Sequence, residues 1–237
     1  MWSNGRSESL LLAELPVPIE IRPIRGALRL RLRYDEARGV LKLTCPPRTS
    51  RRSALAWALD QRGWIEAQLA CTVPPEPFVP GAVIPIDGRK TRLVWSESIG
   101  RTPQLVAGEL RCGGPRSGFE RRIAKYLKQL ALETMSQEAA EFAIAAGVTP
   151  RAISVGDAGT RWGSCSSSGR IRLNWRLILA PPEARRHVVA HEIAHLVHLN
   201  HGPEFKALEA RLFGPGLASA KAALRRAGPR LRRFGRT

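Results

Sequence analysis

The stretch from Pro181 to Phe205 reads PPEARRHVVAHEIAHLVHLNHGPEF and contains all five histidines of a 237-residue chain. Two prolines at its start predict the first turn of a helix, where a fixed φ is favourable and the absent N–H has no partner to lose. The apolar residues between the histidines predict that this helix is buried. Buried imidazoles and carboxylates need partners, and a metal ion can supply them. This helix is therefore expected to organise both the core and a functional site.

His191, Glu192 and His195 form the pattern HExxH. Residues four apart share one face of a helix, so both imidazoles can bind the same Zn²⁺ ion. Zinc lowers the pKa of a coordinated water toward about 7, and the neighbouring glutamate can take its proton as a general base. Because the pattern is short, a helix with two ordinary histidines is the alternative. The apolar residues around the pattern favour the metal site.

A zinc site of this kind needs a third protein ligand. His201 is preferred because a Gly-Pro pair follows it, ends the helix and lets the chain turn back over the metal. His198 lies about 10 Å from the first histidine of the pattern along a straight helix, which is too far for convergence. His187 has no glutamate beside it that could act as a base. Glu204 and Glu209 remain alternative third ligands, because zinc also accepts carboxylates.

Hydrophobic periodicity and turn residues divide the rest of the chain into strands and helices. Alternating patterns over 27–34 and 40–47 predict an antiparallel hairpin. Ser50 or Ser53 can cap a helix that reaches about Thr72. Further along, the patterns predict strands at 82–88, 90–96, 152–157 and 170–180, a long helix over 119–146 that ends at Gly147, and a short helix over 204–213.

These elements predict an α+β protein in three parts. Residues 19–113 are expected to form a β-rich region with one helix, and residues 114–214 to form the core that carries the histidines. Residues 215–237 are expected to form a basic tail or a loosely attached helix, because they contain basic side chains and no acidic ones.

The composition bounds the partners and the location of the chain. It has 38 Lys and Arg residues against 20 Asp and Glu residues, a net charge of +18, so nucleic acid and nucleotides are candidate partners besides a peptide substrate. The 4 cysteines form no CxxC pair, which argues against a disulfide framework or a zinc ribbon. Without a long apolar run, no membrane span is expected and a cytoplasmic location is predicted. The sequence leaves the oligomeric state open.

Three motifs in one order resemble the YgjP-like metallopeptidases, which are related to the SprT and WLM zinc proteases of the zincin group. The motifs are RWGSC at 161–165, LNWRL at 173–177 and HEIAHLVHLNH at 191–201. The resemblance covers residues 19–213 and implies a zincin-like core, with an antiparallel sheet and the HExxH helix beneath it. By position, His191, His195 and His201 match the family's metal-binding histidines and Glu192 matches its catalytic glutamate. The implied activity is zinc-dependent peptide hydrolysis.

The RWGSC motif has two interpretations. Trp162, Gly163 and Cys165 can be structural, with Cys165 as a small buried side chain. Alternatively, their strand is the edge of a sheet and holds an extended peptide by main-chain hydrogen bonds. Arg161 is a candidate substrate contact. Tyr126, Arg161 and His198 are candidates for stabilising the oxyanion.

Two other functions compete with the peptidase. A metal-activated water beside an arginine-rich surface could hydrolyse a nucleoside triphosphate, although the sequence has no P-loop. In the third interpretation the zinc is mainly structural and the protein binds nucleic acid, with the tail from Lys221 to Arg236 contributing most of the affinity. We prefer the peptidase because it accounts for the three motifs together.

Overall fold

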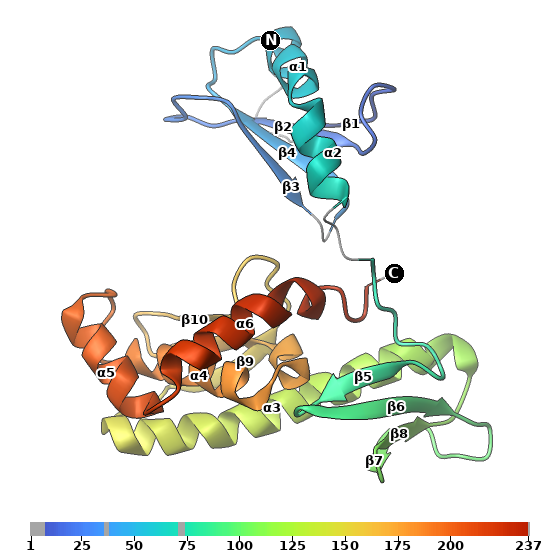
Figure 1. Cartoon of the computed structure of the whole chain (residues 1–237), viewed down its shortest axis with the longest axis vertical. Helices are drawn as coiled ribbons and strands as arrows, with labels where there is room; N and C mark the ends of the chain where they lie inside the picture. Colours follow the sequence, from blue (N-terminus) through green and yellow to red (C-terminus); the bar gives the residue numbers. More distant parts are fainter. Residues whose placement is uncertain (1–7, 36–37, 71–73, 237) are drawn as a thin grey trace. The chain divides into compact units, whose positions relative to one another are not determined.

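The structure, a computed structural model, describes residues 8–35, 38–70 and 74–236 (Figure 1). This part of the chain is a mixed α and β protein with several small sheets and six α-helices. It divides into two compact units between Pro74 and Pro75. No helix in the described ranges is both long enough and apolar enough to cross a membrane.

The first unit is a four-stranded sheet with two helices on one face (Figure 1). Its strands follow the order β1-β2-β4-β3, and the predicted hairpin is confirmed because β3 and β4 pair antiparallel. Alternate apolar side chains of the strands pack against the helices and form a core of their own. The elements are β1 (Glu8–Leu10), β2 (Ile19–Pro23), β3 (Arg31–Asp35), β4 (Val40–Cys45), α1 (Arg51–Asp60) and α2 (Arg62–Ala70).

Two predictions for the first unit need correction. The strand expected over 27–34 is shorter, and Leu28 lies outside it with 96% of its surface exposed. The helix expected to run unbroken toward Thr72 is interrupted at Gln61, which ends α1. The flanking Asp60 and Gly63 are poor helix formers, which accounts for the break. Ser50 caps α1 as predicted, because its side chain accepts a hydrogen bond from the Ser53 amide. Thr72 itself lies outside the described residues.

The second unit contains two further sheets and four α-helices. One sheet has the strand order β5-β6-β8-β7 and the other has the order β10-β11-β9. The elements are β5 (Val83–Ile86), β6 (Arg89–Trp95), β7 (Gln104–Val106), β8 (Glu109–Cys112), the 3₁₀ helix η1 (Arg116–Gly118), α3 (Phe119–Ala146), β9 (Ala152–Gly156), β10 (Gly163–Cys165), β11 (Arg170–Asn174), the 3₁₀ helix η2 (Trp175–Leu179), α4 (Pro182–Ala194), α5 (Pro203–Phe213) and α6 (Leu217–Leu231).

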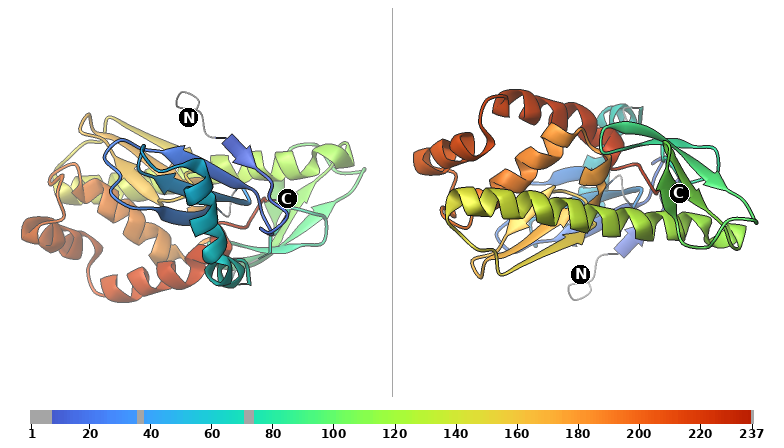
Figure 2. Two further views of the ribbon diagram at one scale, coloured as in Figure 1. Left: turned by 90° about the horizontal axis from the view of Figure 1, so that it is seen from above. Right: turned by 90° about the horizontal axis from the view of Figure 1, so that it is seen from below.

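Helix α3 has the predicted bounds and runs along the second unit beside α4 (Figure 2). It ends at Gly147, whose φ of 67° is the left-handed conformation that favours glycine. Arg185 of α4 joins it through a buried ion pair, with Nη2 2.8 Å from Oε1 of Glu138. The same guanidinium donates through Nη1 to Asp87 at 2.8 Å. These ion pairs of Arg185 help to hold α4, which carries the histidines, against α3.

The sheet beside α4 is mixed, whereas an antiparallel sheet was expected. Strand β11 pairs antiparallel with β10 and parallel with β9. Its predicted continuation to residue 180 is also wrong, because the side chain of Asn174 accepts a hydrogen bond from the Arg176 amide and starts η2. Within the described part of the unit, β10 pairs on one side only and forms an edge of this sheet.

The division of the chain differs from the expected boundary near residue 114. Strands β5 to β8 share one core with α3, through side chains such as Leu93, Leu110 and Phe119. The expected basic tail is also part of the second unit, because α6 buries Ala220 and Leu231. Arg225 and Arg226 of this helix are exposed, so basic residues can occupy one face of the helix while apolar residues pack on another.

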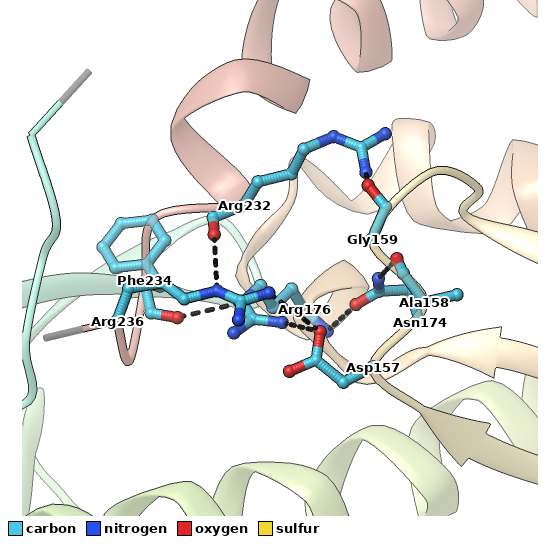
Figure 3. Close-up of polar contacts among 8 residues, drawn as sticks. All are labelled: Asp157, Ala158, Gly159, Asn174, Arg176, Arg232, Phe234 and Arg236. Carbon is cyan, nitrogen blue, oxygen red and sulfur yellow. Dashed lines mark hydrogen bonds and ion pairs between the residues drawn. The ribbon is translucent and has the colours of Figure 1, made fainter. Parts of the chain in front are cut away.

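The segment after α6 is fastened to the loop that follows β9 (Figure 3). Arg176 is 2% exposed and donates through Nε to the Phe234 carbonyl at 2.9 Å and through Nη1 to Asp157 at 2.5 Å. Arg236 also reaches Asp157, at 3.4 Å, and Arg232 donates to the Gly159 carbonyl. These contacts connect the end of the described chain to the segment that leads into β10.

Candidate metal centre

Three histidines converge at the end of α4. His191 lies in the last turn of the helix, His195 follows as its C-cap, and His201 lies just before α5. Their ligand atoms all lie within 4.8 Å of one another, and the Nε2 atoms of His191 and His201 are 3.1 Å apart. Phe205 packs against all three rings, with centroid distances of 4.5 to 4.9 Å. An apolar ring beneath three imidazoles leaves their nitrogens as the polar surface of the site.

The second nitrogen of each helical histidine is held by an oxygen atom. Nδ1 of His191 lies 2.8 Å from Oε1 of Glu209, and Nδ1 of His195 lies 3.1 Å from the His198 carbonyl. Metal-binding histidines in proteins are oriented by acceptors of this kind. Burial lowers the pKa of both imidazoles, which favours the neutral form that binds metals.

Glu209 belongs to a second group of candidate ligands, with His187 and His191. It is 2% exposed, and its Oε1 contacts both histidines, at 3.2 Å from Nε2 of His187. Lys221 donates to its other oxygen at 2.7 Å. Burial raises the pKa of Glu209, but the hydrogen bonds from Lys221 and His191 outweigh it and hold the pKa at about 2. The ionised carboxylate is thus fully engaged by its neighbours.

Glu192 lies beside the histidines but has a different environment. It is 4% exposed, and its Oε2 is buried with no hydrogen-bond partner among the described residues. Burial raises its pKa to about 7, and the opposing attraction of Arg161 is the smaller effect. A Cβ on Gly163 would lie 2.7 Å from Cγ and Cδ of Glu192. The carboxylate therefore occupies space that only a glycine in β10 leaves open.

The remaining candidates lie around this cluster. Glu204 is exposed and lies 3.7 Å from His198, outside both groups of ligand atoms. Cys165 is also outside both groups, and burial together with Glu192 raises the pKa of its thiol. Trp162 packs against Gly228 and under Arg232, which is a structural role. Tyr126 is on α3, packed against the main core.

Sequence reasoning missed two features of the site. Gly163 was expected to be structural or part of an edge strand, and its role in making room for Glu192 was not foreseen. Lys221, expected in a tail, contacts Glu209. The space at Gly163 could have been inferred from the sequence, because a glycine within a strand often marks the close approach of another group. The contact of Lys221 with Glu209 could not have been inferred, because it depends on the packing of α6.

A divalent metal fits these residues. Three imidazoles with nearby nitrogens are a common zinc ligand set with room for a further ligand. The carboxylate of Glu192, next in sequence to His191, keeps one buried oxygen without a hydrogen-bond partner among the described residues.

A protein-family model agrees with this chemistry. The family model described as YgjP-like, metallopeptidase domain, matches residues 28–227. Among solved structures, the crystal structure of the metallopeptidase zymogen of Pyrococcus abyssi abylysin is similar, with 18% sequence identity and a TM-score of 0.36. That similarity covers 42% of this chain and 97% of the other. Comparison with curated proteins finds no match.

Proposed function

The chain belongs to the YgjP-like metallopeptidase family, and from this premise we propose that it is a zinc-dependent peptidase with Glu192 as its general base. The observation that carries the proposal is the convergence of His191, His195 and His201 beside a buried carboxylate. We assign the mixed sheet, α3 and α4 to a zincin-like core on the same grounds.

His191, His195 and His201 would hold the metal. A bound zinc ion would polarise the substrate carbonyl and acidify a coordinated water. Glu209 and the His198 carbonyl orient the first two imidazoles through their Nδ1 atoms. This arrangement leaves Nε2 of each ring directed toward the ligand group, and it supports His201 over Glu209 as the third ligand.

Glu192 is suited to moving a proton between the attacking water and the leaving amine. A pKa of about 7 lets the carboxylate accept a proton and release it near neutral pH. Its buried Oε2 has no competing hydrogen bond among the described residues, so the atom is available to a reactant. Arg161 attracts the carboxylate and remains the candidate contact to the substrate.

Strand β10 would hold the substrate. It forms an edge of its sheet and packs its Gly163 against Glu192, so a peptide paired to that edge passes close to the base. Main-chain hydrogen bonds to an edge strand fix an extended peptide without requiring a particular sequence. A peptide or protein is thus the substrate that this geometry serves best.

The test compares the zinc-loaded full chain with its Glu192→Gln variant on an unfolded protein and on nucleoside triphosphates. We expect cleavage of the unfolded protein, a loss of at least about 100-fold in the variant, and unchanged zinc content. Hydrolysis of triphosphates alone would support the nucleotide alternative. Salt-sensitive binding of nucleic acid without hydrolysis would support a structural zinc.

A further inference from the structure

Four arginines line one hollow of the second unit, and no acidic residue lines it with them. The hollow measures about 710 Å³ and is lined by Arg151, Arg161, Arg170 and Arg172, together with several serines and no Asp or Glu. Within the described part of the chain, none of these guanidiniums has a hydrogen bond or ion pair to another side chain. Like charges gathered in this way repel one another and attract an anion.

Three other arginines of the unit each pair with a carboxylate. Arg176 pairs with Asp157, Arg185 pairs with Glu138, and Arg230 pairs with Glu76. Those arginines support the fold by neutralising a nearby carboxylate. The arginines of the hollow form no such ion pair in the described ranges. Arg161 is attracted to Glu192, and the charges of the other three are available to a ligand.

The register of the sheet places this charge on one face. Gly163 pairs with Leu173, which is 1% exposed, so these two residues face the core and α4. Ser164 pairs with Arg172, and Arg172 pairs with Ser154, so this row faces the opposite side. Arg170, two residues before Arg172, shares that outer face.

Strand β10 therefore connects the arginine hollow with Glu192. Its inner side meets Glu192, its outer side belongs to the arginine hollow, and its free edge lies between them. A strand added to this edge would lie about 4.8 Å from β10, and its side chains would alternate between the two faces. Every second side chain would then point toward the arginines, within reach of their long, flexible stems.

We infer that the arginine hollow selects substrates whose extended segment carries Asp or Glu at alternate positions. The inference rests on the proposed peptidase function and adds its substrate class. Carboxylates at these positions meet guanidiniums that form no ion pair among the described residues. Carboxylates one residue out of phase would instead point toward Glu192, where like charges repel.

The test uses two synthetic peptides of identical composition and the same scissile dipeptide. Outside that dipeptide, and counted from the scissile bond, one peptide carries Glu at the odd positions and neutral residues at the even positions. The other peptide has the reverse pattern. For the zinc-loaded full chain we expect kcat/KM to differ at least about fivefold between them, a preference that declines with salt. Equal rates would overturn the inference, whereas failure to cleave any peptide, including a neutral one, would contradict the proposed function.

Matched variants identify the source of the preference. Arg151→Gln with Arg170→Gln should reduce the difference between the two peptides and leave the cleavage of a neutral peptide unchanged. Arg92→Gln, which removes another exposed strand arginine of the same unit, should keep the full difference. A preference that the double substitution leaves undiminished would overturn the inference.

A binding measurement tests the preference for alternate acidic residues independently of turnover. Fluorescent forms of both peptides are titrated onto the full-length Glu192→Gln variant, with a single-stranded oligonucleotide of equal charge as competitor. We expect the peptide that is cleaved faster to bind at least about fivefold more tightly than the other. Equal affinity of the two peptides, or preferential binding of the oligonucleotide at the same arginines, would count against an acidic peptide.

Discussion

Gly163 and Glu192 share a space that has no room for a methyl group on the glycine. A Cβ at residue 163 would lie 2.7 Å from Cγ and Cδ of the glutamate, well inside van der Waals contact. The glycine is not in a left-handed conformation, so its requirement here is space rather than backbone freedom. One residue of an edge strand thereby determines where the proposed general base lies.

Gly163→Ala is therefore expected to displace Glu192 without removing a metal ligand. Misplacing a reacting group by about 1 Å can lower kcat/KM about 100-fold, and overpacking costs about 1–3 kcal/mol of stability. Zinc content, measured by elemental analysis, should stay at the wild-type level. Gly159→Ala is the matched control, because a Cβ there meets no atom within 4 Å. Equal activity of the two variants would show that Glu192 tolerates displacement or is not the base.

His201→Ala is expected to weaken zinc binding more than any other substitution between residues 196 and 205. Loss of a ligand should exceed the roughly 10–100-fold effect of losing an orienting group. His198→Ala is the control, because His198 holds His195 through its backbone carbonyl, which the substitution retains. Competition with a chelating dye gives both affinities. An unchanged affinity in His201→Ala would eliminate His201 as the third ligand.

Glu209→Gln distinguishes an orienting carboxylate from a ligand. If Glu209 positions His191 and His187 as the distances indicate, zinc affinity should fall about 10–100-fold while one ion per chain still binds. If Glu209 is the third ligand, this variant should lose zinc and His201→Ala should keep it. The two substitutions thus give opposite results under the two assignments.

Local patterns in the sequence predicted local parts of the structure. The start of α4 at Pro182 and the end of α3 at Gly147 follow from the backbone preferences of single residues. HExxH is also local, since helix periodicity alone brings His191 near His195. These features depend on neighbours within a few residues, which is why they could be read directly.

Features that depend on distant segments could not be predicted in this way. The parallel pairing of β9 with β11 has no short turn to specify it, in contrast to the hairpin of β3 and β4. Arg176 is charged, and only the distant Asp157 and Phe234 explain why it is buried. The sequence predicted a basic tail or a loosely attached helix at 215–237, because the charged residues there obscure the apolar stripe by which α6 packs.

The pair formed by Asp157 and Arg176 gives the last prediction, a stability that depends on acid. Burial alone would raise the pKa of Asp157, but the hydrogen bond and charge of Arg176, with Arg236, lower it below its ordinary value of 3.8. A carboxyl whose pKa is lowered by folding stabilises the fold above its unfolded pKa. That contribution is lost as the pH falls through the lower, folded pKa.

Asp157→Asn should therefore destabilise the protein near pH 7 and matter progressively less as the pH falls below 3.8. At neutral pH we expect a loss of about 1–2 kcal/mol, because the buried Arg176 loses a charged acceptor while solvent screens the 39% exposed Asp157. Denaturant unfolding of both proteins from pH 7 to acid measures the difference, with Glu97→Gln as a control at an exposed carboxyl. A difference that stays constant over this range would mean that the ion pair does not contribute through its charge. Because the same pair fastens the chain end to the loop before β10, peptide cleavage should decline in Asp157→Asn at temperatures well below its unfolding (Figure 3).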